Sequence, residues 1–369
     1  MKLTSDPFVA GNSQPITDWA QSPWTTVVLL CALFWAVASA AVSGSISKHG
    51  MPDGARGGGV EVMLDASAKK PYVYRQLAPL VANAVGAYTP QPVQTFISEW
   101  VAPERIYARA QSVVKPEFRF RYIVIYYLCF ISLLGSLFLL REILLFYDFH
   151  PVAAVFAPAT LVLGFPYLQT GGGYYYDSIE LFFCALVFLL VLRDKLVMAL
   201  AATLLATLNK ESFFFFIPTL YPLLRSRYPM KHAVAWTACG VGAAGLVNLY
   251  LKLAFFDAPG KAAEFKLFRN ILTYLTPSTY LQFENTYGIV APFGVFLGSL
   301  LIFAIVVAKA WKDCTLEVRQ HLILGALINL PLFFLFCAPG ELRNLSLLFV
   351  GLTTLIALLI QRQILKPRH

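Results

Sequence analysis

Long apolar runs recur along this chain, and they constrain its fold more than any other feature. A helix needs about 20 mostly apolar residues to cross a bilayer. Runs of this kind occupy the stretches 24–45, 120–140, 152–168, 178–192, 233–253, 288–308, 321–338 and 344–361. Hydrophobic residues make up 58% of the chain and charged residues only 13%, which excludes a water-soluble globular protein. The sequence therefore predicts an all-α polytopic membrane protein with about eight full spans.

The segment 196–224 carries an interrupted apolar pattern. Its stretches LVMALAATLLATL and FFFFIPTLYPLL are each too short to cross a bilayer upright, and the polar residues NKES (209–212) separate them. Two short or broken membrane helices that meet at a polar tip fit this pattern. One long helix over 196–217 with a buried polar patch is the alternative. Ionisable residues at membrane depth are functional by default, which favours the first interpretation.

Lysines and arginines collect in alternate connections, as expected if ten membrane segments alternate in direction. The basic connections are 193–195, 225–231, 309–319 and 362–368. The positive-inside rule assigns that side to the cytoplasm. We therefore expect the following organisation: cytoplasmic tails at 1–23 and 362–369, and a transmembrane domain at 24–361 that includes periplasmic loops at 46–119 and 254–287. The formal net charge of +9 follows largely from this signal and calls for no nucleic acid.

Several common chemistries find no support in the sequence. The six cysteines show no CxxC spacing and no grouping with histidine, so neither a disulfide framework nor a zinc site is predicted. Walker A and Rossmann glycine patterns are also absent, which argues against ATP-driven chemistry on this chain. No cleavable signal peptide is predicted, because Asp6 and Asp18 precede the first apolar run.

The extended first outer loop combines acids with a basic group. Glu61 and Asp65 are followed by Lys69, Lys70 and Arg75. A carboxylate at the membrane surface can act as a general base on an acceptor hydroxyl during group transfer. The three cations are candidate phosphate ligands, arginine through a bidentate fork and lysine as a point charge. Alternatively, Asp65 caps the start of a helix and the cations contact lipid head groups.

Carboxylates and tyrosines meet in the string GGGYYYDSIE. Asp177 and Glu180 are three residues apart, so a helix that begins here places both on one face. Capping of that helix is an alternative role for Asp177, whereas Glu180 lies a turn deeper. Tyrosines near both outer clusters suit either a sugar-stacking wall or an interfacial belt. The tyrosines that we single out as candidate substrate contacts are Tyr72, Tyr74, Tyr175 and Tyr176.

Two further polar turns fall at the same end of the apolar runs. Asn209, Lys210 and Glu211 offer a donor, a cation and an acid, with the last two as an internally compensated pair. Glu341 and Arg343 flank the last outer turn. Lys210 and Arg343 are candidate phosphate ligands. The carboxylates and amide of these turns, together with those of GGGYYYDSIE, are candidate substrate ligands.

Four strings, taken in order, carry a resemblance to a known family. LDASAKKPYVYRQLAP, YYYDSIELFF, LATLNKESFFFFIPTLYP and PGELRNLSLLF resemble bacterial polytopic proteins related to the GT-C glycosyltransferases, over about residues 60 to 350. The resemblance implies a polyprenyl-phosphate sugar donor, a glycan, lipid or protein acceptor, and transfer on the periplasmic face of the inner membrane. It also implies an acid of the first outer loop as base, which maps to Asp65, with Asp53 and Glu61 as neighbouring candidates. Many GT-C enzymes place this acid closer to the first span, where Asp53 lies.

The expected reaction requires no metal, because a polyprenyl phosphate leaving group needs mainly neutralised charge. With a single base, direct displacement would invert the anomeric centre. A divalent cation remains possible if Asp65, Asp177 and Glu211 converge. The main alternative is a transporter or lipid flippase in which 196–224 lines the path and its charged tip binds substrate or protons. A non-catalytic scaffold of an envelope complex is a third interpretation.

Overall fold

The computed structural model describes residues 23–51, 57–101, 116–170 and 174–364. In this part of the chain, seven helical segments are long and apolar enough to cross a membrane. They are α1 (Pro23–His49), α6 (Arg119–Phe146), α7 (Pro151–Leu168), α8 (Tyr175–Leu192), α11 (Met230–Ala254), α14 (Leu316–Phe336), and α15 (Phe349–Ile364) with the preceding turn η8 (Leu342–Leu348). The prediction of an all-α, multi-pass membrane protein is confirmed at this level.

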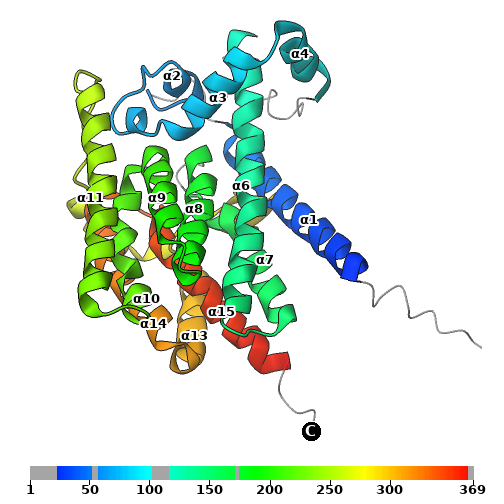
Figure 1. Ribbon diagram of the computed structural model, residues 1–369. Coiled ribbons are helices and arrows are strands. Elements are labelled where there is room, and N and C mark those ends of the chain that lie inside the picture. Colours follow the sequence, from blue (N-terminus) through cyan, green and yellow to red (C-terminus); the bar gives the residue numbers. More distant parts are fainter. Residues whose placement is uncertain (1–22, 52–56, 102–115, 171–173, 365–369) are drawn as a thin grey trace, which may run out of the picture.

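Helix α8 forms the centre of the bundle. Its sequence is apolar on all sides after Glu180, and such a helix is stable only when it is surrounded by other elements. The most apolar window of α8 is 83% buried, compared with 17% for α11. Helices α6 and α9 (Leu196–Asn209) pack against α8 on either side (Figure 1). The first two turns of α8, which carry Asp177 and Glu180, are therefore held inside the protein.

The prediction that 196–224 forms two short or broken helices, which meet at a polar tip, agrees with the structure. Helix α9 ends at Asn209, and Lys210 adopts an extended backbone with φ −154° and ψ 124°. Short helical pieces follow: η4 (Glu211–Phe215), η5 (Ile217–Leu220) and α10 (Tyr221–Arg225). Pro218 and Pro222 stand in the first turns of η5 and α10, where their missing N–H costs nothing.

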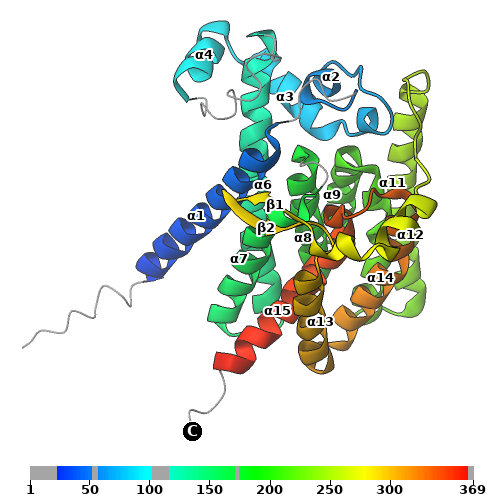
Figure 2. The same ribbon diagram turned by 180° about the vertical axis from the view of Figure 1, so that it is seen from behind.

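The predicted span 288–308 does not form as one helix. The chain first makes a hairpin of β1 (Phe283–Thr286) and β2 (Ile289–Pro292), and then α13 (Leu297–Ala310). Tyr287 and Gly288 both have positive φ, as a two-residue hairpin turn requires. The 14 residues of α13 extend about 21 Å, which is shorter than a bilayer core. Figure 2 shows the hairpin beside α1, where Glu284 pairs with Lys48.

The first outer loop lies across one end of the bundle, here called the loop end (Figure 1). Helix α1 begins and α15 ends toward the opposite end. The first loop contains α2 (Val60–Leu64), η1 (Tyr72–Tyr74), α3 (Leu77–Tyr88), α4 (Gln91–Phe96), the π-helical turn η2 (Ile97–Val101) and η3 (Pro116–Phe118). The loop before the hairpin contains α12 (Leu267–Leu275) and η6 (Pro277–Leu281). The two loops meet where the Lys70 amide donates to the Pro259 carbonyl at 2.8 Å.

Basic turns gather at the opposite end, as the alternation predicted. Arg227, which follows α10, donates to the Val191 carbonyl at 3.3 Å and therefore reaches the end of α8. Arg362 of α15 pairs with Asp313 in the turn η7 (Trp311–Asp313) after α13. These contacts place the connections after α8, α10 and α13 and the end of α15 on one side of the bundle.

Candidate functional site

A cavity of about 670 Å³ lies at the loop end of the bundle. The first outer loop, the broken segment, α11, α14 and η8 all contribute to its wall. Three tyrosines, Tyr72, Tyr74 and Tyr176, and two phenylalanines, Phe215 and Phe336, also line it. Its basic lining residues are Lys70, Arg75, Lys210, Lys252, Lys261, Lys266 and Arg343, and its acidic ones are Glu211, Glu264 and Glu341. A cavity with more basic than acidic lining residues suits an anionic ligand.

Lys210 connects the broken segment to the first turn of α8. Its Nζ lies 3.1 Å from Asp177 Oδ1 and 2.6 Å from Glu180 Oε2. Asn344 Oδ1 accepts a third hydrogen bond from Nζ at 3.3 Å, and Ser212 Oγ donates to Glu180 Oε1 at 3.2 Å. The predicted face shared by Asp177 and Glu180 is therefore used to bind one cation. The prediction that neighbouring Lys210 and Glu211 compensate each other is wrong. The backbone at Lys210 is extended, and Lys210 pairs with Glu180 whereas Glu211 pairs with Arg75.

Arg343 reaches the same acids from the last outer turn. Its Nε lies 3.4 Å from Asp177 Oδ2, and its Nη2 donates to Glu341 Oε1 at 3.0 Å. The side chain is only 6% exposed, and its guanidinium lies 4.7 Å from the ring centroid of Tyr174. Buried charges are tolerated when they are paired and hydrogen-bonded. Arg343 and Asp177 each have an ion-pair partner and a hydrogen bond through another atom, whereas Arg343 Nε and Asp177 Oδ2 meet only as an ion pair. Three segments far apart in the sequence thus join through Asp177.

Arg75 and Glu211 form a bidentate pair between the first outer loop and η4. Nη2 donates to Oε1 at 3.1 Å and Nε to Oε2 at 3.3 Å. The guanidinium also lies over the rings of Tyr176 (4.1 Å) and Tyr72 (5.3 Å). Burial opposes the charge of this guanidinium, but the Glu211 carboxylate outweighs that effect and holds the pKa of Arg75 well above its usual value. The fork and the stacking fix the loop against the bundle.

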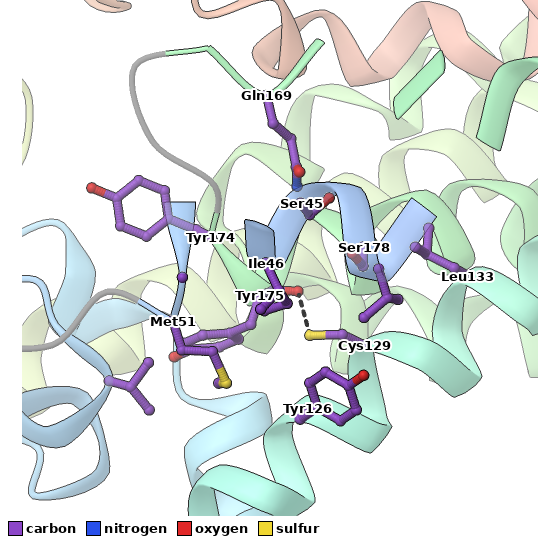
Figure 3. A pocket seen from close by; sticks show the side chains of 13 residues that line it. Ser45, Ile46, Met51, Tyr126, Cys129, Leu133, Gln169, Tyr174, Tyr175 and Ser178 are labelled. Carbon is purple, nitrogen blue, oxygen red and sulfur yellow. Dashed lines mark hydrogen bonds between the residues drawn. The ribbon is translucent and has the colours of Figure 1, made fainter. Parts of the chain in front are cut away.

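The predicted tyrosines are divided between two places. Tyr72 and Tyr176 line the cavity. The ring of Tyr174 contacts both of them and stacks on Tyr176 with ring centroids 5.1 Å apart. Tyr175 instead lines a separate pocket of about 40 Å³ between α1, α6 and α8 (Figure 3). There its carbonyl accepts a hydrogen bond from Cys129 Sγ at 3.6 Å. Asn209 lines neither space, and its Nδ2 donates to the Tyr176 carbonyl at 2.9 Å.

Asp65 and Glu61, the two predicted catalytic acids that the structure describes, do not line the cavity. Asp65 is exposed and stands after the last residue of α2, so it does not cap a helix start as the alternative interpretation held. Glu61 lies in the first turn of the same short helix, and Asp53 falls outside the described residues. Lys69, a predicted phosphate ligand, is exposed and also lies apart from the cavity wall. The carboxylates that reach the cavity come from other segments.

The three carboxylates proposed to share a divalent ion do not meet. Asp177 is held by Lys210 and Arg343, Glu211 is held by Arg75, and Asp65 is on the surface. Across the described ranges, no group of three or more His, Cys, Asp or Glu side chains is arranged to hold a metal ion. Asp65, Asp177 and Glu211 therefore do not form the shared cation site considered from the sequence.

Sequence reasoning missed part of the cavity wall. Lys252, at the end of α11, and the string KAAEFK (261–266) both reach it, as do Asn329 and Asn344. The available signal was KAAEFK itself, which places three charged residues within six positions of an outer loop. Lys252 is indistinguishable in sequence from a lysine that ends a membrane span at the head-group level.

Comparisons with protein-family models, with curated proteins and with solved structures found no match to this chain. The geometry of the cavity therefore carries the functional argument.

Proposed function

We propose that this protein is an integral-membrane glycosyltransferase that uses a polyprenyl-phosphate-linked sugar. It would act on the periplasmic face of a bacterial inner membrane, with both termini in the cytoplasm. The acceptor would be a glycan, a lipid or a protein. The observation that carries the proposal is the 670 Å³ cavity at the loop end of a membrane bundle, in which cations, carboxylates and tyrosines face one space. The resemblance of the outer strings to GT-C proteins supports it independently.

The reaction needs few components, and the cavity offers each of them. The acceptor hydroxyl oxygen attacks the anomeric carbon and forms the new glycosidic bond, while a carboxylate takes the hydroxyl proton. The bond from the anomeric carbon to the phosphate oxygen breaks, and its electron pair leaves with the polyprenyl phosphate. Cations stabilise this leaving group. One direct displacement of this kind inverts the anomeric centre.

The carboxylates in the cavity are better placed than Asp65 to act as the base. Glu211 lines the cavity beside Tyr176, and its side chain is 27% exposed. Glu341 also lines it, but three donors hold its carboxylate: the side chains of Arg343 and Asn344 and the Ala338 amide. Arg75 also holds the Glu211 carboxylate, but the Glu211 side chain is more exposed than that of Glu341, 27% against 16%. We therefore assign the base to Glu211 in this proposal and leave Asp65 as the outer-loop candidate to be tested against it.

A transporter or glycolipid flippase is the second candidate, and one observation favours it. The interruption after α9 places Lys210 and Glu211 in the wall of the cavity, as in the broken helices of transporters. The charged groups that line this cavity, however, gather at one end of the bundle. Transfer chemistry at one face agrees better with this distribution.

The test is sugar transfer by purified protein in nanodiscs, supplied with radiolabelled polyprenyl phosphate sugars and a membrane extract as acceptor. We expect wild type to consume a donor, Glu211→Gln to lose transfer, and Asp65→Asn to retain it. Loss in Asp65→Asn with full retention in Glu211→Gln would return the base to the first outer loop. Movement of labelled lipid across proteoliposomes without donor consumption would replace the transferase by the flippase.

A further inference from the structure

The charges around the cavity separate into two groups with opposite balance. The inner cluster comprises Arg75, Asp177, Glu180, Lys210, Glu211, Glu341 and Arg343. The rim group comprises Lys70, Lys252, Lys261, Glu264 and Lys266. The inner cluster has three cations and four carboxylates, a formal charge of −1. The rim group has four cations and one carboxylate, a formal charge of +3.

The cations of the inner cluster are already committed to partners inside the protein. Lys210 binds two carboxylates, and Arg75 uses its fork on Glu211. Arg343 is shared between Asp177 and Glu341. A phosphate entering this cluster would have to displace a carboxylate and would meet an excess of negative charge. The inner cluster is therefore poorly suited to hold an anion.

The lysines of the rim group are in a different state. Within the described residues, no carboxylate forms an ion pair with Lys70, Lys252 or Lys261, whereas Lys266 pairs with Glu264 at 3.1 Å. Lys70 Nζ donates to the Phe256 carbonyl at 2.6 Å, which ties it to the loop that carries Lys261. Lys252 and Lys261 are exposed. This edge of the cavity has positive charge to offer an incoming anion.

We infer that the rim group is the anion-binding subsite of the cavity and that it takes a phosphate group. The inference rests on the proposed function for the identity of the whole ligand, but the phosphate chemistry follows from the charges alone. Lys252 ends a membrane-spanning helix, so a phosphate on a lipid reaches this edge without leaving the head-group level. The donor then lies with its phosphate at Lys70, Lys252 and Lys261 and its sugar toward Glu211.

This orientation suits the reaction electrostatically. Positive charge develops at the anomeric carbon as the bond to phosphate breaks, and the inner cluster presents the carboxylates of Glu211 and Glu341 to the cavity on that side. Negative charge develops on the leaving phosphate, which lies beside the rim lysines. The candidate phosphate ligands Arg75, Lys210 and Arg343 then act as positioning residues for the carboxylates.

Binding of farnesyl phosphate to the detergent-purified full-length protein tests the inference, with farnesol as the uncharged probe. We expect Lys252→Gln/Lys261→Gln to bind farnesyl phosphate roughly 10- to 30-fold more weakly, because each lysine near a phosphate contributes on the order of a tenfold factor or less. Lys252→Arg/Lys261→Arg should restore binding. The matched control is Lys309→Gln/Lys312→Gln, which removes two exposed lysines at the opposite end and should bind as wild type does.

Inorganic phosphate, added as a competitor, separates two sources of the anion. Competition would support a site for phosphate in general, and its absence would support a site for lipid phosphates. Equal binding by the rim variant and wild type, or equal affinity for farnesol and farnesyl phosphate, would overturn the inference. If the rim variant binds farnesyl phosphate more weakly but the wild-type protein transfers no sugar, the phosphate subsite is supported and the transferase proposal fails. If the wild-type protein transfers sugar but the rim variant binds farnesyl phosphate as wild type does, the transferase proposal is supported and the phosphate subsite fails.

Discussion

The inner cluster and the rim group both border one cavity, but their charges are compensated in different ways. The side chains of Lys210, Asp177 and Glu180 are at most 5% exposed, and each has an ion-pair partner. The rim lysines Lys252 and Lys261 are exposed and have no carboxylate partner among the described residues. A buried charge must be compensated within the protein, whereas an exposed one is compensated by water. Among the cations, pairing therefore identifies those committed to the fold, and its absence identifies those available to an anionic ligand.

The largest expected effect comes from removing the central cation of the inner cluster. Lys210→Met leaves Asp177 and Glu180 buried without it, and we expect a loss of about 3–5 kcal/mol in the free energy of unfolding. Thermal unfolding of protein in nanodiscs measures it. Adding Glu180→Gln should recover part of the loss, because one of the uncompensated charges is removed. Lys252→Met is the matched control at the rim, with an expected change below about 1 kcal/mol. Equal melting temperatures for the two lysine variants would break the comparison.

A smaller effect is expected where charge is kept but geometry is lost. Arg75→Lys retains the cation and abolishes the bidentate fork to Glu211 and the stacking on Tyr176. We expect about 1–3 kcal/mol of destabilisation. Faster hydrogen exchange in η1, relative to α3, should accompany it, because the fork holds that turn against the bundle. Unchanged exchange in η1 would show that the pair does not fix the loop.

The smallest expected effect comes from a substitution next to the rim group, and it tests whether the position of Lys70 matters for phosphate binding. Gly260 has φ +93°, and an added Cβ would lie 3.0 Å from the Lys70 carbonyl oxygen. We expect Gly260→Ala to cost about 1–2 kcal/mol locally and to weaken farnesyl phosphate binding with little change in the melting temperature. Gly288→Ala also places a residue at positive φ but meets no neighbour within 4 Å, and it serves as the control. Equal phosphate binding by both variants would separate the rim subsite from the docking of its two loops.

The number of spans is one feature that hydropathy along the sequence did not predict correctly. The run 288–308 has the composition of a span, but Tyr287 and Gly288 form a hairpin turn and the helix begins only at Leu297. Hydropathy averages over a window, so a short apolar strand and a short apolar helix together resemble one long helix. The interruption at Lys210 was predictable, because charged residues inside an apolar run are costly unless the backbone brings them to partners.

The amino-acid sequence by itself determined the membrane bundle, the broken segment, and the identity of most inner-cluster residues. These follow from local properties: the length of apolar runs, the cost of buried charge and the helical spacing of Asp177 and Glu180. Only the tertiary structure decided the partners: Lys210 with two acids of α8, Arg75 with Glu211, and Asp65 with none of them. The same holds for the meeting of Lys70, Lys252 and Lys261 at one rim. Ion pairs join residues far apart in the chain, and spacing along the sequence carries no information about which distant charges the packing of helices brings together.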